Sequence, residues 1–148
     1  MKLLVSLISA VSILFSFSAF SKTILLSTKG PGAGNPFWAS VEAGAKDAAE
    51  EFGVNLIILS PPQESDVMAQ VAQIEDQIAK GVDGIAIAPT DPNAVAPILD
   101  DAMASGVPVV YIDTNGINEG VTFIGTNNIN GAASVSYTHL TLPTICSV

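Results

Sequence analysis

Asn35, Phe37 and Trp38 are the side chains best suited by type and spacing to hold a small ligand. They lie where an apolar β-type run passes into a helix start, and open parallel α/β sheets bind ligands at such turns, outside the carboxyl ends of their strands. The Asn35 amide can donate and accept hydrogen bonds, or cap the helix, or do both. Each ring offers a flat apolar face, although one of two neighbouring rings is expected to pack into the core. An amide beside a ring suits a sugar.

Asp113 is a second candidate, because it ends the apolar run 107–112 and the same rule points it toward the ligand. A carboxylate that accepts two adjacent hydroxyl protons is a strong sugar anchor, since a hydrogen bond to a charged group contributes roughly 1.5–3 kcal/mol. The alternative is a turn-forming aspartate before residues 114–116. Asp91 precedes Pro92 and is expected to cap a helix instead.

Further polar candidates of lower rank follow other strand ends: Thr90, Thr114, Asn115 and Asn127. The glycine-rich loop 27–34 lacks the lysine of a phosphate-binding loop and the spacing of a dinucleotide motif, so we expect a flexible lip. Lys29 near its tip could meet an anionic substituent, but we expect it to be solvated.

The first residues form an export leader. Met1 and Lys2 give a positive start, an apolar and serine-rich run extends to Phe20, and small residues flank a cleavage position after Ser21. We therefore expect a signal peptide over residues 1–21. A transmembrane anchor is the alternative, but five serines interrupt the run and no basic stop-transfer flank follows.

The rest of the chain is acidic. The whole sequence has 5 lysines, no arginine, 14 carboxylates and a formal net charge of −9. Such a surface repels nucleic acid and anionic lipid, so we expect neither as a partner. A neutral or cationic ligand fits better.

Residues 22–133 alternate between two patterns. Helical stretches occupy the first three intervals between five apolar β-type runs, at 23–27, 55–59, 84–88, 107–112 and 121–124. Strands that alternate with helices predict βαβ units. The expected fold class is α/β, a doubly wound, Rossmann-like parallel sheet with one core.

Each expected helix carries a start or stop signal. The first, over 36–52, has Asn35 as its cap and Gly53 beyond its end. The third should begin at Asp91. The second, which ends at Lys80, should bury a stripe at helical spacing: Val67, Val71, Ile74 and Ile78.

Six short motifs, taken in their order along the chain, resemble those of one protein family. In order they are Asn35-Pro36-Phe37-Trp38, Gly53-Val54-Asn55-Leu56, Gly81-Val82-Asp83-Gly84-Ile85, Pro89-Thr90-Asp91, Gly106-Val107-Pro108-Val109-Val110 and Gly125-Thr126-Asn127-Asn128. Together with the leader they resemble the amino-terminal lobe of ribose-type periplasmic sugar-binding proteins. The resemblance implies two lobes with a ligand cleft between them. Residues 22–127 would form the first lobe, and 128–134 would begin the crossing into a second lobe that is absent.

Two positions depart from the ribose-specific pattern. Ala88 stands where that pattern has an amide, and Thr114 where it has an arginine after the aspartate. The loop 27–34 is also longer than in the ribose type. Two hydrogen-bonding groups are therefore missing or shortened, which argues against ribose itself.

Residues 135–148 fit no helix of the expected second lobe and resemble the translation of a transposon-type sequencing adapter, so we interpret them as an artefactual tail; a short natural β tail is the alternative. The only histidine and cysteine, His139 and Cys146, lie in it. Residues 22–133 contain no histidine or cysteine and so have no residues for His-assisted nucleophilic catalysis or a Cys/His metal site. We expect no enzymatic activity, no cofactor and no metal.

The resemblance implies a periplasmic solute-binding component of an ABC importer for a monosaccharide or polyol. The lobes would close about a hinge, and an inner-membrane permease would recognise the closed state. We expect a monomer at full length. The alternative is a sensor whose closed form docks on a histidine kinase or chemoreceptor.

Overall fold

The structure, a computed structural model, describes residues 21–126 and 132–133. Their elements are β1 (Thr23–Ser27), α2 (Pro36–Phe52), β2 (Asn55–Leu59), α3 (Val67–Ala79), β3 (Gly84–Ile87), α4 (Pro92–Ala104), β4 (Val109–Ile112) and β5 (Thr122–Ile124). In these ranges no helix is long and apolar enough to cross a bilayer. Most of the expected leader, Asn127 and the expected tail lie outside the described residues.

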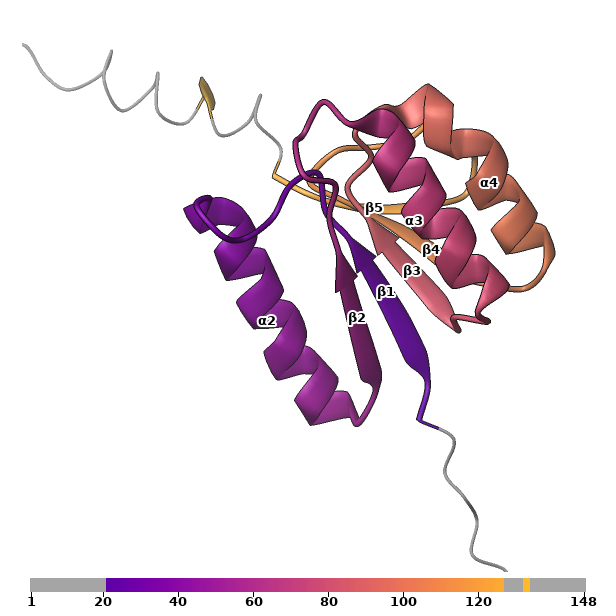
Figure 1. The fold of residues 1–148 in the computed structure, drawn as a ribbon, viewed down its shortest axis with the longest axis horizontal. Coiled ribbons are helices and arrows are strands. Elements are labelled where there is room, and N and C mark those ends of the chain that lie inside the picture. Colours follow the sequence, from indigo (N-terminus) through magenta and orange to yellow (C-terminus); the bar gives the residue numbers. More distant parts are fainter. Residues whose placement is uncertain (1–20, 127–131, 134–148) are drawn as a thin grey trace, which may run out of the picture.

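The sheet confirms the α/β prediction. Its 5 strands run in the order β2-β1-β3-β4-β5, and all four neighbouring pairs are parallel. Helix α2 lies on one face, while α3 and α4 lie on the other (Figure 1). The chain therefore reverses its direction across the sheet between β1 and β3, and the helices that follow β1 and β3 leave on opposite faces. Such a switch point opens a crevice at the carboxyl ends of the strands.

The predicted elements are reproduced with small shifts at their ends. Strand β4 begins two residues later than the apolar run, at Val109. The reason is that the Val107 amide bonds the Ala102 carbonyl at 3.0 Å and so closes the end of α4, while Pro108 has no amide hydrogen to give to the ladder.

The buried side of α3 agrees with the predicted stripe only in part. Its fully buried positions are Gln70, Ile74 and Gln77, which also follow helical spacing. Val71 and Ile78 instead line a groove of about 440 Å³ between α3 and α4. Ile74 of the predicted stripe is buried in the core as expected, and Val71 and Ile78 are partly buried against the same core. The two buried glutamines were not predicted.

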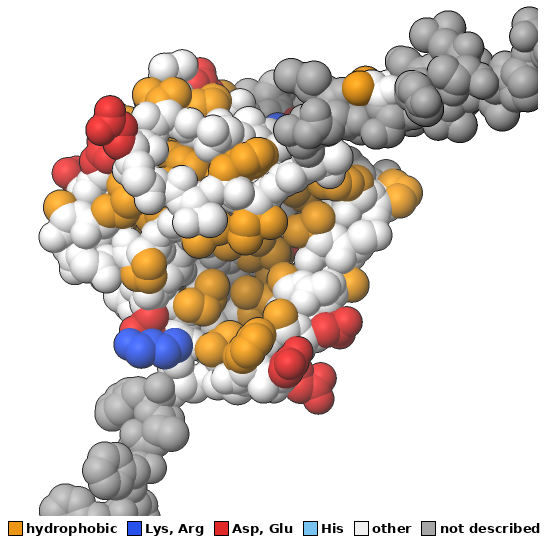
Figure 2. Space-filling view, turned by 180° about the vertical axis from the view of Figure 1, so that it is seen from behind, with side chains coloured by type: hydrophobic (Ala, Val, Ile, Leu, Met, Phe, Trp, Pro, Cys, Tyr) orange, Lys and Arg blue, Asp and Glu red, His pale blue; other side chains and the backbone are white. Residues whose placement is uncertain are grey.

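The core lies between the sheet and the pair α3 and α4. Alternate strand residues point into it, among them Leu25, Ile87 and Tyr111, each 0% exposed. The other face of the sheet is covered less completely, since only α2 lies over it in the described chain. Apolar side chains gather in the middle of the view from behind (Figure 2). Ile24, Leu56 and Ala86 of the strands line a hollow against α2.

Candidate ligand-binding site

Asn35 caps α2 as predicted. Its Oδ1 accepts a hydrogen bond of 3.0 Å from the Phe37 amide, and Pro36 occupies the first turn. This bond uses one acceptor position and leaves the Nδ2 group, which bonds none of the residues that the structure describes. Asn35 can therefore cap the helix and still donate to a ligand.

The two neighbouring rings differ in how far they are buried. Phe37 is 51% exposed, whereas Trp38 is 2% exposed, and its Nε1 donates a 2.9 Å hydrogen bond to Oε1 of Glu64. The rings meet edge to face, with centroids 4.8 Å apart and an interplanar angle of 72°. Trp38 thus presents no open ring face to a ligand in this structure. Its ring packs against the ring of Phe37.

A hollow of about 390 Å³ lies beside Phe37 at the carboxyl end of the sheet. It is lined by the start of α2 and by the ends of β4 and β5: Phe37, Val41, Ile112, Asp113, Ile124, Gly125 and Thr126. Of the predicted site residues, the structure brings Phe37 and Asp113 together here. Its sides are mostly apolar and carry one carboxylate, which is a common composition for a small-molecule site.

Asp113 adopts a backbone conformation that most residues avoid. Its φ is 58°, and its amide donates to the Ile124 carbonyl at 3.0 Å. Left-handed geometry costs roughly 1–2 kcal/mol for most residues and less for aspartate or asparagine. The hydroxyl of Thr114 donates to Asp113 Oδ2 at 3.0 Å. Asp113 therefore forms a turn and lines the hollow as well.

Lys29 is the partner of that carboxylate. Its Nζ lies 3.3 Å from Asp113 Oδ2, and the two side chains are 23% and 35% exposed. The expectation of a solvated lysine is wrong, because the loop after β1 folds toward β4. Thr28 Oγ1 donates to the Gly30 carbonyl at 2.9 Å, and the Gly32 amide donates to Glu42 at 2.8 Å.

Gly32 explains part of the glycine content of this loop. A Cβ atom placed there would lie 2.7 Å from the carboxylate of Glu42, the group that the Gly32 amide bonds. A side chain at this position would displace the Glu42 carboxylate and weaken its hydrogen bond with the Gly32 amide. The expected lip is thus bonded at several points along its length.

Thr90 lies away from the hollow. Its amide donates to Oε1 of Gln70 at 2.8 Å, and its hydroxyl oxygen is buried without a hydrogen-bond partner among the described residues. Gln70 escaped the sequence prediction because a glutamine carries no apolar signal. Its spacing from Ile74 on the buried side of α3 was the available clue.

The loop after β4 is anchored on Tyr111. The Tyr111 hydroxyl bonds Asn118 Oδ1, and Asn118 Nδ2 donates to the Ala96 carbonyl at 2.9 Å. A Cβ on Gly116 would lie 1.9 Å from the Tyr111 ring. Burial raises the pKa of the Tyr111 hydroxyl. Asn115 lies exposed on this loop, outside the hollow.

Asp91 acts as the predicted helix cap. Its Oδ1 accepts from the amides of Asn93 and Ala94 at 2.8 and 3.4 Å. Within residues 21–126 and 132–133, no three His, Cys, Asp or Glu side chains gather as they would around a metal ion.

The comparisons with known proteins agree with this architecture. Residues 29–135 match the periplasmic binding protein domain. The ribose import binding protein RbsB of Bacillus subtilis (strain 168) is 36% identical over 98 residues, which are 66% of this chain and 32% of that protein. The D-allose-binding periplasmic protein of Escherichia coli (strain K12) is 34% identical over 107 residues, 70% of this chain and 33% of that protein.

Among solved structures, a periplasmic sugar-binding protein of an ABC sugar transporter from Legionella pneumophila is 32% identical. It superposes with a TM-score of 0.71 over 81% of this chain and 45% of its own. The chain thus spans about a third to just under half of these relatives, from 32% to 45% of their length. Because the domain match covers well over half of the chain, the protein belongs to the periplasmic binding protein domain family.

Proposed function

We propose that the protein is the sugar- or polyol-binding component of an ABC importer and that the described residues form the first of two lobes. The observation that carries the proposal is the hollow in which the exposed Phe37 ring and the Asp113 carboxylate lie together at the carboxyl end of the sheet. The relatives are named for ribose and allose. An apolar face and a hydrogen-bond acceptor are what a sugar ring requires.

The residues in and beside the hollow have different roles in ligand binding in this proposal. Asp113 accepts hydrogen bonds from two adjacent hydroxyl groups, and Phe37 packs against the C–H face of the sugar ring. Asn35 donates from Nδ2 to a further hydroxyl. Trp38 acts through Phe37, against whose ring it packs. Thr114 and Asn127 are kept as second-rank ligand groups, whereas Thr90 and Asn115 lie outside the hollow and could serve only a ligand that extends beyond it.

The departures from the ribose pattern bear on the substrate. Ala88 is 0% exposed, so the end of β3 offers no side-chain hydrogen bond to a ligand. The Thr114 hydroxyl is turned toward Asp113. We propose a monosaccharide or polyol other than ribose.

In the full-length protein a second lobe would face this hollow and supply further polar groups. Ligand that bridges the two lobes stabilises the closed state, which a membrane permease then recognises. The protein performs no chemistry on the sugar, acts as a monomer, and reaches the periplasm after removal of residues 1–21. The import roles named for the relatives favour this function over a sensor for a kinase or chemoreceptor.

Calorimetric titration of the full-length protein with a panel of aldoses and polyols tests the function. At least one should bind, and Asp113→Asn should weaken that binding by about tenfold or more, because a charge-assisted hydrogen bond is lost. Asparagine is chosen because it tolerates the positive φ of this position. Asp47→Asn, an exposed carboxylate on α2, is the control.

Two outcomes are decisive. Binding by the parent protein with unchanged affinity in Asp113→Asn would remove Asp113 from the site. Failure of the folded parent protein to bind any aldose or polyol would contradict the proposed function.

A further inference from the structure

Gln70 contacts the ends of two neighbouring strands with one side chain. It is 0% exposed and projects from α3 into the carboxyl edge of the sheet. Its Nε2 donates to the Ala88 carbonyl at 2.9 Å, to Ser27 Oγ at 3.2 Å and to the Thr28 carbonyl at 3.3 Å. Its Oε1 accepts from the Thr90 amide at 2.8 Å. The amide therefore joins the end of β1 to the end of β3.

These contacts begin where the strands stop pairing. The last backbone bond between β1 and β3 runs from the Ala88 amide to the Ser27 carbonyl at 2.8 Å. Beyond it, the carbonyls of Thr28 and Ala88 and the amide of Thr90 face Gln70. A buried backbone group without a partner costs about 1–3 kcal/mol, so the glutamine satisfies groups that an apolar side chain would leave unpaired.

We call these hydrogen bonds of Gln70 to the ends of β1 and β3 the Gln70 clamp. The clamp is connected to the candidate site through Lys29. Thr28 precedes Lys29, and its hydroxyl also bonds the Gly30 carbonyl, so the backbone is fixed on both sides of Lys29. The Lys29 ammonium then lies against Asp113. A shift of the β1 end would move this ammonium away from the carboxylate that lines the hollow.

We infer that Gln70 is a positioning residue for ligand binding: it holds the loops after β1 and β3 in the arrangement that brings Lys29 to Asp113. This inference rests on the proposed function for its effect on affinity, while its effect on the loops stands on the contacts alone. Gln70 does not line the hollow.

Gln77 provides a matched control. It lies on the same buried side of α3 and is 6% exposed, but its Nε2 donates to its neighbour Asp76 at 2.9 Å. It makes no hydrogen bond to the strand ends near the hollow. Methionine resembles glutamine in size and shape, so Gln70→Met and Gln77→Met remove one amide each from a similar environment.

Hydrogen exchange in the full-length protein tests the clamp without any sugar. In Gln70→Met, segments 27–34 and 88–91 should exchange at least about tenfold faster, since the Thr90 amide loses its acceptor. Segments 53–55 and 81–84, at the opposite end of the sheet, should keep their rates, and Gln77→Met should leave both loops unchanged. Unchanged exchange of both loops in Gln70→Met would overturn the inference whether or not a sugar binds.

Affinity gives the second measurement. At a temperature where circular dichroism shows both variants folded, Gln70→Met should bind the sugar found for the parent protein about tenfold more weakly, and Gln77→Met should match the parent. Equal losses in the two variants would reduce Gln70 to a structural role. If the parent protein binds no sugar, the proposed function fails, and the exchange of the two loops still decides the clamp.

Discussion

The ammonium of Lys29 lies 3.3 Å from Oδ2 of Asp113, which joins the loop after β1 to the end of β4 across the intervening strand β3. Because both side chains keep contact with solvent, such a pair contributes no more than about 1 kcal/mol to stability. Its consequence is local. The cation fixes the direction of the one carboxylate that lines the hollow.

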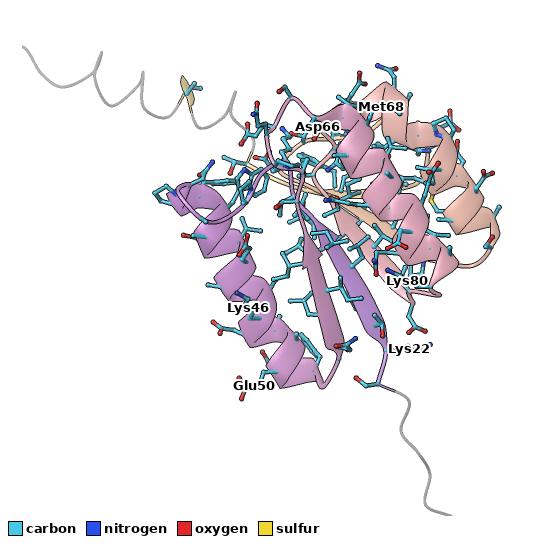
Figure 3. All side chains as sticks on the ribbon, in the orientation of Figure 1. Lys22, Lys46, Glu50, Asp66, Met68 and Lys80 are labelled. Atoms are coloured by element: carbon cyan, nitrogen blue, oxygen red, sulfur yellow. The ribbon has the colours of Figure 1, made fainter. Side chains whose placement is uncertain are left out.

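Lys29→Met should therefore affect binding more than folding. We expect the free energy of unfolding to change by less than about 1 kcal/mol and the affinity of the full-length protein for its sugar to fall roughly fivefold. Lys46→Met is the control, since Lys46 lies midway along α2 (Figure 3) and is exposed. Tighter binding by Lys29→Met would mean that the ligand has to displace the lysine, contrary to the arrangement proposed above.

Phe37→Ala should weaken sugar binding by about 1 kcal/mol, the usual contribution of a ring contact beyond its area. Stability should hardly change, because the residue is already half exposed, at 51%. Calorimetry and urea unfolding on the same sample measure the two effects. An affinity equal to that of the parent protein would remove Phe37 from the site.

Trp38→Phe should show the opposite pattern. The substitution removes the Nε1 donor and leaves the Glu64 carboxylate without its 2.9 Å partner. Glu64 is exposed and can bond water instead, so we expect a loss of about 1 kcal/mol in the free energy of unfolding, the usual net contribution of one hydrogen bond. Circular dichroism in urea measures this loss, and affinity should fall only slightly. A normal stability with strongly impaired binding would instead place the indole in the ligand site.

Asp91→Ala should cost about 1 kcal/mol of stability, as the loss of a helix cap usually does, and leave affinity intact. Asp66 caps α3 through a 3.1 Å bond to the Ala69 amide, so Asp66→Ala should give a similar loss. A weakened affinity in Asp91→Ala alone would show that this carboxylate also serves the ligand.

Local sequence pattern could predict the roles of some of these residues and not of others. Asn35, Gly53 and Asp91 act on residues within a few positions of themselves, so their roles as caps could be predicted from local pattern and are observed. The placement of Phe37 and Asp113 at one edge followed from the rule that parallel strands end together.

The remaining features depend on residues distant in sequence. Whether Phe37 or Trp38 is buried depends on where Glu64 lies, and the direction of Lys29 depends on how the loop after β1 folds. The buried amide of Gln70 has partners on two strands, so no short pattern could reveal it. Each required the packing of α3 against the sheet to be known.

Tyr111 gives a prediction on pH. Burial raises the pKa of its hydroxyl above the ordinary value of 10.0, Asp100 adds to the rise, and the hydrogen bond with Asn118 opposes it. Since the folded pKa lies above the unfolded one, the resulting stability is complete below pH 10.0 and is lost as the pH rises through the folded pKa.

The free energy of unfolding should accordingly fall more steeply above that pH in the parent protein than in Tyr111→Phe. The variant should also lose about 1 kcal/mol at neutral pH, because Asn118 loses its hydroxyl partner. Urea unfolding at a series of alkaline pH values measures both effects, and the lysines contribute equally to the two proteins. Parallel curves would show that the Tyr111 hydroxyl titrates alike in the folded and unfolded chains and would contradict this prediction.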